Sequence, residues 1–106
     1  MFEKFDYESV TGFDWDERKS RSNLAKHGIA FDAAVEIFYG PIVLRRSDRN
    51  HEERWVAIGS SENRVIAVVF TLRTDVIRII SARRARKTEE GEYRNAQVGR
   101  PSKGQD

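Results

Sequence analysis

The sequence predicts one small α+β domain, with two helices at its start, a four-stranded antiparallel sheet in the middle and one helix near its end. Residues 14–40 contain residue types that begin and end helices, among them Asp14 and Gly28. Residues 42–82 contain four apolar segments that are separated by short polar turns. Because short turns join strands in an antiparallel manner, these four segments predict a meander.

The two N-terminal helices are expected from their end signals and apolar spacing. Asp14 is the predicted N-cap of the first helix because Glu17 completes a capping-box pattern three residues later. This helix is expected to run to about His27, since the glycine that follows supplies a left-handed stop. The second helix is expected from about Asp32 to Tyr39.

Four strands and a last helix follow. The predicted strands cover residues 42–46, 54–59, 65–72 and 76–82. The third of these ranges is a nearly unbroken apolar run, which is typical of a central strand that is covered on both faces. Thr88 is the predicted N-cap of the last helix, which is expected over residues 89–95.

Length and composition set the expected organisation. At 106 residues the chain has room for one domain, so we expect an N-terminal arm at residues 1–12, the folded domain at residues 13–96 and a disordered tail at residues 97–106. The chain has no cysteine, which excludes disulfides and thiolate metal sites. No apolar stretch approaches the roughly 20 residues of a membrane span, so a cytoplasmic location without membrane contact is expected.

The net charge of +2 conceals an uneven distribution. Residues 1–17 hold six acidic side chains and one lysine, whereas residues 18–106 hold 18 basic and 11 acidic side chains. The basic part predicts a surface that attracts phosphate, although a solvated surface of mixed charge has a similar composition.

The first helix carries polar side chains at the spacing that usually carries an apolar stripe. Lys19, Asn23, Lys26 and His27 stand at positions i, i+4, i+7 and i+8, within an arc of about 100°. We expect these side chains to form a functional face of the helix. The structural alternative is that Lys26 and His27 only offset the negative end of the helix dipole.

A second basic group lies on the last strand and just after it. Its members are Arg78, Arg83, Arg84, Arg86 and Lys87. Alternation along the strand predicts that Arg78 shares a face with Ile80 and Ala82. In the structural alternative, Arg78 forms an ion pair with Glu52 or Glu53.

Two further residues extend the candidate surface. Arg54 opens the second strand, from which it can converge with Arg78 and the first helix across the sheet. Tyr93 lies on the last helix, and its structural alternative is a hydrophobic residue that covers the sheet.

The composition favours cleavage of RNA without a cofactor. Two histidines that are 24 residues apart, without cysteines, do not make a zinc site, and the chain has neither a glycine-rich phosphate loop nor a serine nucleophile motif. RNA carries its own nucleophile, the 2′-OH, so the enzyme needs only a general acid–base pair and cations that stabilise the phosphorane. His27 is the natural acid or base near neutral pH. Two alternatives stay open: a nucleic-acid-binding module without catalysis, and a protein whose basic face receives an acidic partner.

An ordered set of residues spans most of the chain. It begins with Phe13-Asp14-Trp15-Asp16, Lys19, Asn23, Lys26-His27-Gly28, Phe31 and Ala34, continues with Asp48, Glu52, Arg54 and Ile58-Gly59, and ends with Arg78-Ile79-Ile80-Ser81-Ala82-Arg83-Arg84-Ala85. Over residues 13–94 the chain resembles the BrnT family, the ribonuclease toxins of bacterial type II toxin–antitoxin pairs. The resemblance implies a RelE-like fold, in which helices pack beside a small twisted antiparallel sheet.

The same resemblance implies the function and the partners. The protein would cut RNA without a metal ion or cofactor and so inhibit translation. A BrnA-type antitoxin would neutralise it in a hetero-oligomer, for example of 2:2 composition. Operator DNA would be bound only through the antitoxin, and the complex would repress its own promoter.

Together with the two basic groups, the resemblance gives two sets of expected site residues. The expected catalytic residues are Lys26, His27, Arg54, Arg78 and Arg83. The expected RNA-binding residues are Lys19, Asn23, Arg84, Arg86 and Tyr93.

Overall fold

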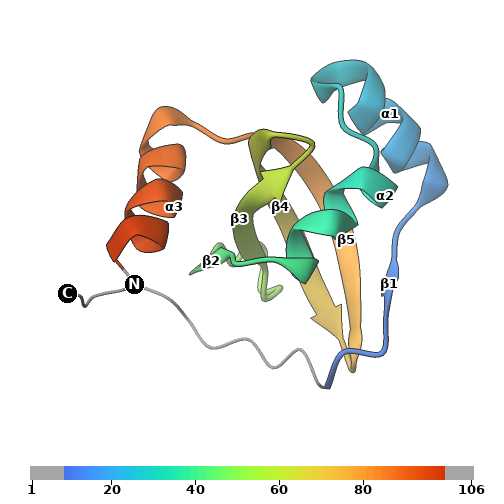
Figure 1. Ribbon diagram of the computed structural model, residues 1–106. Coiled ribbons are helices and arrows are strands. Elements are labelled where there is room, and N and C mark those ends of the chain that lie inside the picture. Colours follow the sequence, from blue (N-terminus) through green and yellow to red (C-terminus); the bar gives the residue numbers. More distant parts are fainter. Residues whose placement is uncertain (1–8, 100–106) are drawn as a thin grey trace.

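The computed structural model of the protein describes residues 9–99 (Figure 1). In chain order, its elements are β1 (Gly12–Asp14), α1 (Glu17–His27), α2 (Phe31–Ala34), the 3₁₀ helix η2 (Val35–Tyr39), β2 (Val43–Arg46), β3 (Trp55–Ser61), β4 (Arg64–Arg73), β5 (Val76–Arg84) and α3 (Lys87–Gly99). The predicted α+β class is confirmed. None of the helices in residues 9–99 is long and apolar enough to cross a membrane.

The structure describes only part of the expected N-terminal arm and only part of the expected C-terminal tail. Residues 1–8 of the expected N-terminal arm lie outside the described residues, and so do residues 100–106 of the expected tail. Within the described part, α3 continues through the first three residues of that expected tail.

The sheet has five strands in the order β1-β5-β4-β3-β2. The four predicted strands are present and form the expected antiparallel meander. The prediction of a purely antiparallel four-stranded sheet is wrong, because β1 adds a fifth strand that runs parallel to β5. A three-residue strand is too short to show alternation in the sequence. It forms because residues 12–14 pair with residues 76–78 at the edge of β5.

α1 begins two residues later than predicted. Its N-cap is Asp16, whose carboxylate accepts hydrogen bonds from the backbone N–H groups of Arg18 at 2.8 Å and Lys19 at 3.3 Å. Asp14, the predicted cap, is instead the last residue of β1. The predicted stop at Gly28 is confirmed, since this residue has a φ of 73° in the left-handed region.

The second and the last helices also differ from the prediction in detail. The second is divided into one α-helical turn, α2, and the 3₁₀ helix η2. It has no side-chain cap of its own; the N–H of Phe31 donates to the hydroxyl of Ser20 at 3.0 Å, which ties the start of α2 to α1. α3 begins at Lys87, so Thr88 lies inside the helix and is not its N-cap.

The sheet buries apolar side chains on both faces. Figure 1 shows α1 and α2 on one side of the sheet and α3 on the other. On the α2 side, Phe31, Ile37 and Phe70 belong to the larger cluster and are at most 1% exposed. Neighbouring residues of β4 face opposite clusters, with Val68 on the α2 side and Ala67 on the α3 side. The predicted central strand with two covered faces is therefore confirmed.

A bulge in β5 changes which residues share a face. Ser81 pairs with Val69, but the next pair is Ile79 with Phe70, so Ile80 is passed over. Beyond the bulge, Ala82 joins the core cluster on the α2 side. The prediction that Arg78 and Ala82 share a face is therefore wrong, because the extra residue of a bulge reverses the alternation of side chains beyond it.

Arg83 is brought onto the face of Arg78 by the same bulge. Arg83 pairs with Ala67, and Arg78 pairs with Thr71. Residues 67 and 71 of β4 are an even number of residues apart and therefore point to the same face, which is the α3 side.

Candidate functional site

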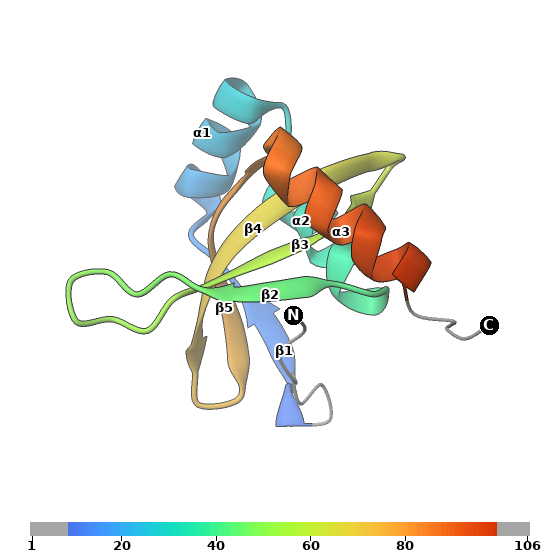
Figure 2. The same cartoon turned by 90° about the vertical axis from the view of Figure 1, so that its left-hand side faces the viewer.

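The face of the sheet that carries α3 is covered only in part. The apolar cluster beneath α3 consists of Val43, Val56, Ile58, Ala67 and Tyr93. Figure 2 shows α3 crossing one end of the sheet and leaving the end toward the β4–β5 turn uncovered. Strand pairing and alternation place five arginines on this face, namely Arg45, Arg54, Arg73, Arg78 and Arg83. We call this surface the arginine face.

Three of the expected site residues meet at a polar pocket on the arginine face. Lys19 comes from the first turn of α1, Arg54 directly precedes β3, and Arg78 lies on β5. Together they line a pocket of about 140 Å³. Thr71 and Arg73 of β4 also line it. The sequence did not single out these two residues, because only the register between β4 and β5 places them opposite Arg78 and Val76.

Both expected catalytic arginines at the pocket are paired with exposed carboxylates. Arg54 Nε donates to Glu52 Oε1 at 2.8 Å, and the guanidinium of Arg78 donates to the carboxylate of Asp14. The Asp14 side chain is 50% exposed and that of Glu52 is 38% exposed. The sequence suggested Glu52 or Glu53 as the ion-pair partner of Arg78. In the structure the partner is Asp14, which β1 places opposite Arg78. Because solvent reaches both carboxylates, these pairs are weak and can exchange with other ions.

The remaining cations of the pocket are less engaged. Within residues 9–99, the side chains of Lys19 and Arg73 make neither a hydrogen bond nor an ion pair. Asp16 also lines the pocket, and hydrogen bonds from the backbone N–H groups of Lys19 and Arg18 hold the pKa of this carboxyl below its ordinary value. The pocket thus holds more cationic than anionic side chains, and it can receive an anion.

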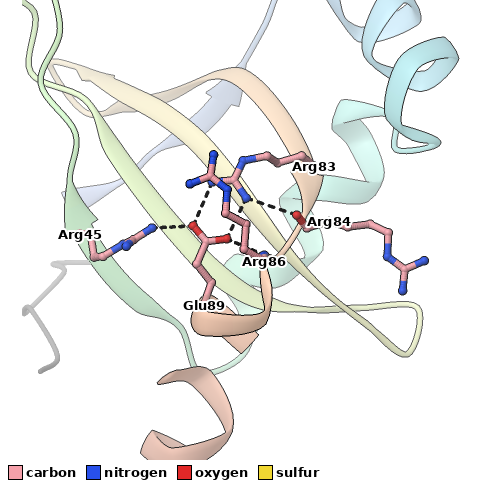
Figure 3. A network of polar contacts seen from close by, with 5 residues as sticks. All are labelled: Arg45, Arg83, Arg84, Arg86 and Glu89. Carbon is pink, nitrogen blue, oxygen red and sulfur yellow. Dashed lines mark hydrogen bonds and ion pairs between the residues drawn. The ribbon is translucent and has the colours of Figure 1, made fainter. Parts of the chain in front are cut away.

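A second cluster lies where α3 begins (Figure 3). Its centre is the carboxylate of Glu89, which is 1% exposed. Arg83 donates to both carboxylate oxygens at 2.8 and 2.9 Å, and Arg45 donates to Oε2 at 2.6 Å. The backbone N–H of Arg86 donates to Oε1 at 2.8 Å. One buried carboxylate therefore joins β2, β5 and the first turn of α3.

The charges of this cluster stabilise one another. The side-chain hydrogen bond from Arg83, followed by the backbone hydrogen bond from Arg86, lowers the pKa of Glu89 from 4.5 to about 2. The same hydrogen bond raises the pKa of Arg83. Sequence reasoning missed Glu89 and Arg45. In the sequence Glu89 is an ordinary acidic residue in the first turn of a helix, and only the sheet order brings Arg45 to it.

Arg84 and Arg86 lie at the edge of this cluster. Figure 3 shows the Arg84 side chain pointing away from Glu89, although its carbonyl accepts a hydrogen bond from Arg83 at 3.3 Å. The side chains of both residues are exposed. They can meet an anion from solvent without any rearrangement of the fold.

Two of the expected RNA-binding residues are buried. The carboxamide of Asn23 donates to the carbonyls of Ile29 at 2.8 Å and Ala82 at 2.7 Å, and it accepts from the N–H of Ala82 at 3.1 Å. It therefore occupies the edge of β5 beyond the end of β1, as a neighbouring strand would. Tyr93 is 8% exposed and packs in the apolar cluster beneath α3. For both residues the structure supports a structural role.

Lys26 and His27 occupy the exposed last turn of α1. His27 is eight residues beyond Lys19, which corresponds to about 12 Å along a helix axis. The link between Asn23 and Ala82 sets this end of the helix beside the end of β5, so it lies nearer to Arg83 and Arg84 than to the pocket. The structure therefore divides the predicted helix face between two places.

In the part of the chain from residue 9 to residue 99, no group of three or more His, Cys, Asp or Glu side chains is arranged so that it could hold a metal ion.

The sequence matches one family model. Residues 15–89, more than two thirds of the chain, match the model described as the ribonuclease toxin BrnT of a type II toxin–antitoxin system. No curated protein matches the chain. The matched range contains the pocket residues and ends at Glu89. The chain therefore belongs to the BrnT family of ribonuclease toxins of type II toxin–antitoxin systems.

Proposed function

We propose that this toxin is an endoribonuclease that cuts RNA without a metal ion, by attack of a 2′-OH on the adjacent phosphate. The observation that carries the proposal is the convergence of Lys19, Arg54 and Arg78 on one pocket whose acidic partners are exposed. A phosphate that enters the pocket can replace Asp14 and Glu52 as the partner of the two arginines, because exposed ion pairs exchange readily.

The pocket cations act on the phosphorane that forms during the reaction. Arg54 and Arg78 donate to the non-bridging oxygens, where negative charge increases in the transition state. Each well-aimed donor contributes roughly 3–4 kcal/mol of transition-state stabilisation. Arg73 adds positive charge from β4, and no metal ion is needed for this electrostatic role.

Proton transfer is assigned to groups that lie at the pocket. Glu52 takes the proton of the 2′-OH, and the ammonium of Lys19 donates a proton to the departing 5′-oxygen. The products are a 2′,3′-cyclic phosphate and a 5′-hydroxyl. His27, expected from the sequence to be an acid or base, lies about 12 Å along the helix axis from Lys19. We therefore assign Lys26 and His27 to RNA contacts beyond the pocket.

We assign Arg83 a supporting role in place of the catalytic role that the sequence suggests. Both of its terminal nitrogens donate to Glu89, so it has little left to offer a phosphate. Its charge is balanced by the carboxylate of Glu89, and we assign it the role of holding the start of α3 against β5. Arg84 and Arg86, which are exposed at the end of β5, extend the basic surface along which RNA is held.

As a type II toxin, the protein has an antitoxin partner. We propose that this partner is of the BrnA type, that the two form a 2:2 hetero-oligomer, and that the complex binds operator DNA through the antitoxin and represses its own promoter. RNA cleavage by the toxin, once released, inhibits translation. The net positive charge of residues 18–106 supports both RNA binding and the capture of an acidic antitoxin segment.

The proposal is tested by comparing arginine variants in RNA cleavage. Arg78→Ala removes a pocket donor and is expected to lower kcat by about 10²- to 10³-fold. Arg94→Ala is the matched control, because Arg94 is an exposed arginine in an ion pair with Glu90 on α3. Equal activity of the two variants would contradict the assignment of the pocket.

A second comparison concerns the general base. Glu52→Gln keeps the size of the side chain and its hydrogen bond to Arg54, but removes the base, and it is expected to lower kcat by about 10²-fold or more. His27→Ala is expected to raise KM and leave kcat within about twofold. A loss of kcat in His27→Ala with full activity in Glu52→Gln would return the role of base to His27.

A further inference from the structure

We propose that Arg45 is a second phosphate-binding residue for the RNA backbone, and that the buried carboxylate of Glu89 is the residue that positions it. The proposal rests on the proposed function, since it extends the path of the RNA from the pocket across the arginine face. Neither residue was expected from the sequence to take part in the site.

The Glu89 cluster has an excess of positive charge, and this charge lies on its solvent-exposed side. The two guanidinium groups of Arg45 and Arg83 share one carboxylate, which leaves one positive charge in excess. Arg83 already satisfies Glu89 with two hydrogen bonds, and the N–H of Arg86 adds a third. The excess charge is carried by Arg45, whose side chain is 43% exposed, against 24% for Arg83.

Arg45 also keeps donors that the protein does not use. Within residues 9–99 only its Nη2 is hydrogen-bonded, to Glu89, so Nε and Nη1 keep unused donors on a side chain that is 43% exposed. A guanidinium has five donors in a fixed fork and is never deprotonated, which suits a phosphate. Because the contact with Glu89 fixes the guanidinium, less side-chain freedom is lost when an anion binds.

The position of Arg45 fits one RNA strand that also occupies the pocket. Arg45 pairs with Val56, which lies two residues along β3 from Arg54. Two residues along a strand span about 7 Å, and neighbouring strands are about 4.8 Å apart. Arg45 therefore lies roughly 8 Å from Arg54 in backbone position, on the same face of the sheet. A single strand whose phosphate enters the pocket passes Arg45 with a neighbouring phosphate.

A purely structural role for the cluster would not require Arg45. Replacing a buried ion pair by apolar side chains is often neutral or stabilising, so stability alone gives no reason to add a second arginine to a satisfied carboxylate. A second cation that is exposed and only partly hydrogen-bonded is instead expected where an anion arrives from solvent.

The test is the binding of a 2′-O-methyl RNA oligonucleotide to the full chain, followed by fluorescence anisotropy over a range of salt concentrations. This probe lacks the nucleophilic 2′-OH, so binding is measured without cleavage. Arg45→Ala is expected to raise Kd about tenfold and to reduce the slope of log K against log salt by about 0.7. Arg94→Ala, which removes the same charge from the exposed side of α3, is expected to stay within twofold. Equal effects of the two variants would overturn the site.

The positioning role of Glu89 has its own readout. Glu89→Gln is expected to raise Kd by a similar factor, and the double variant Arg45→Ala with Glu89→Gln to bind no more weakly than Arg45→Ala alone. A residue that only supports the fold would lower the melting temperature without this coupling. Additive effects on Kd would therefore overturn the positioning role. If Glu89→Gln does not fold, Arg45→Ala and Arg45→Lys decide the site, and Arg45→Lys is expected to keep the salt slope but bind more weakly.

The proposed function and this inference fail in different experiments. If the wild-type protein binds the probe through Arg45 but leaves natural RNA intact, the catalytic proposal fails and the phosphate site stands. If natural RNA is cut while Arg45→Ala binds the probe as tightly as the wild type, the phosphate site fails and the catalytic proposal stands.

Discussion

The two groups of arginines on one face of the sheet differ in the carboxylates that accompany them. At the pocket, Arg54 and Arg78 are paired with Glu52 and Asp14, whose side chains are 38% and 50% exposed. At the start of α3, Arg45 and Arg83 share Glu89, which is 1% exposed. Water and substrate can reach the first two carboxylates, but neither can reach Glu89.

This difference separates a site that can exchange its anion from one that cannot. An exposed ion pair contributes about 0–1 kcal/mol, so a phosphate can displace its carboxylate at little cost. A buried carboxylate with four hydrogen bonds stays where it is, and it fixes the arginines that it holds. The pocket is therefore suited to bind substrate, and the Glu89 cluster is suited to hold the surrounding surface in place.

The largest expected effect is on stability, and it belongs to the buried carboxylate. Glu89→Ala leaves Arg45 and Arg83 without their shared carboxylate and is expected to destabilise the fold by about 3 kcal/mol. This value is at the lower end for buried pairs because both arginines keep solvent contact. For a chain of this size the melting temperature should fall by about 12 °C or more. Asp14→Ala should change the unfolding free energy by no more than about 1 kcal/mol. Thermal unfolding followed by circular dichroism measures both, and equal losses would remove the distinction.

The dependence of the unfolding free energy on acidic pH should reflect the ionisation of Glu89. The pKa of Glu89 lies at about 2 in the folded chain, below the ordinary value of 4.5, so folding favours its ionised form. Its contribution is complete above about pH 4.5 and is lost as the pH falls toward 2, a loss of about 3 kcal/mol. Urea unfolding at several pH values checks this. Glu89→Gln should show a much weaker dependence over the same window, and an unchanged dependence would assign the acid sensitivity to other groups.

A substitution of Asn23 on α1 distinguishes a structural role of this residue from a role in RNA binding. Asn23→Ala leaves the N–H and C=O of Ala82 unpaired at the buried edge of β5, at an expected cost of about 2–3 kcal/mol. RNA affinity, measured well below the melting temperature, should be unchanged. Weaker RNA binding with full stability would instead support the contact expected from the sequence.

The smallest expected effect concerns the exposed pair at the pocket. Asp14→Asn removes the negative charge that competes with phosphate for Arg78, so RNA affinity should rise by a few-fold while stability changes by less than about 1 kcal/mol. Equilibrium binding of the 2′-O-methyl RNA measures the change. A decrease in affinity would show that Asp14 holds Arg78 in its binding position, as Glu89 is proposed to do for Arg45.

Local patterns predicted most of the fold, because they are carried by neighbouring residues. The apolar run of β4, the left-handed stop at Gly28 and the four strands of the meander are examples. β1 was not predicted, since three residues carry no pattern and the strand exists only through its pairing with β5. The bulge in β5 was missed for a similar reason, and with it the shared face of Arg78 and Arg83.

The site was predictable only in part. Residue type and position indicated Lys19, Arg54 and Arg78, which the fold brings to one pocket. The polar spacing of α1 also pointed to Asn23, but an amide at that spacing can serve the edge of a strand equally well. Glu89 could not be found, because its role depends on arginines 44 and 6 residues away that meet it only in the folded chain.

The most direct test of the account is to incubate the purified toxin, free of antitoxin, with RNA in the presence of EDTA and to determine the new ends. The account predicts fragments with 2′,3′-cyclic phosphate and 5′-hydroxyl ends, produced by the wild type and by Arg94→Ala but not by Arg78→Ala. RNA that stays intact in EDTA and is cut only when a divalent ion is added, or fragments that carry 5′-phosphates, would contradict it.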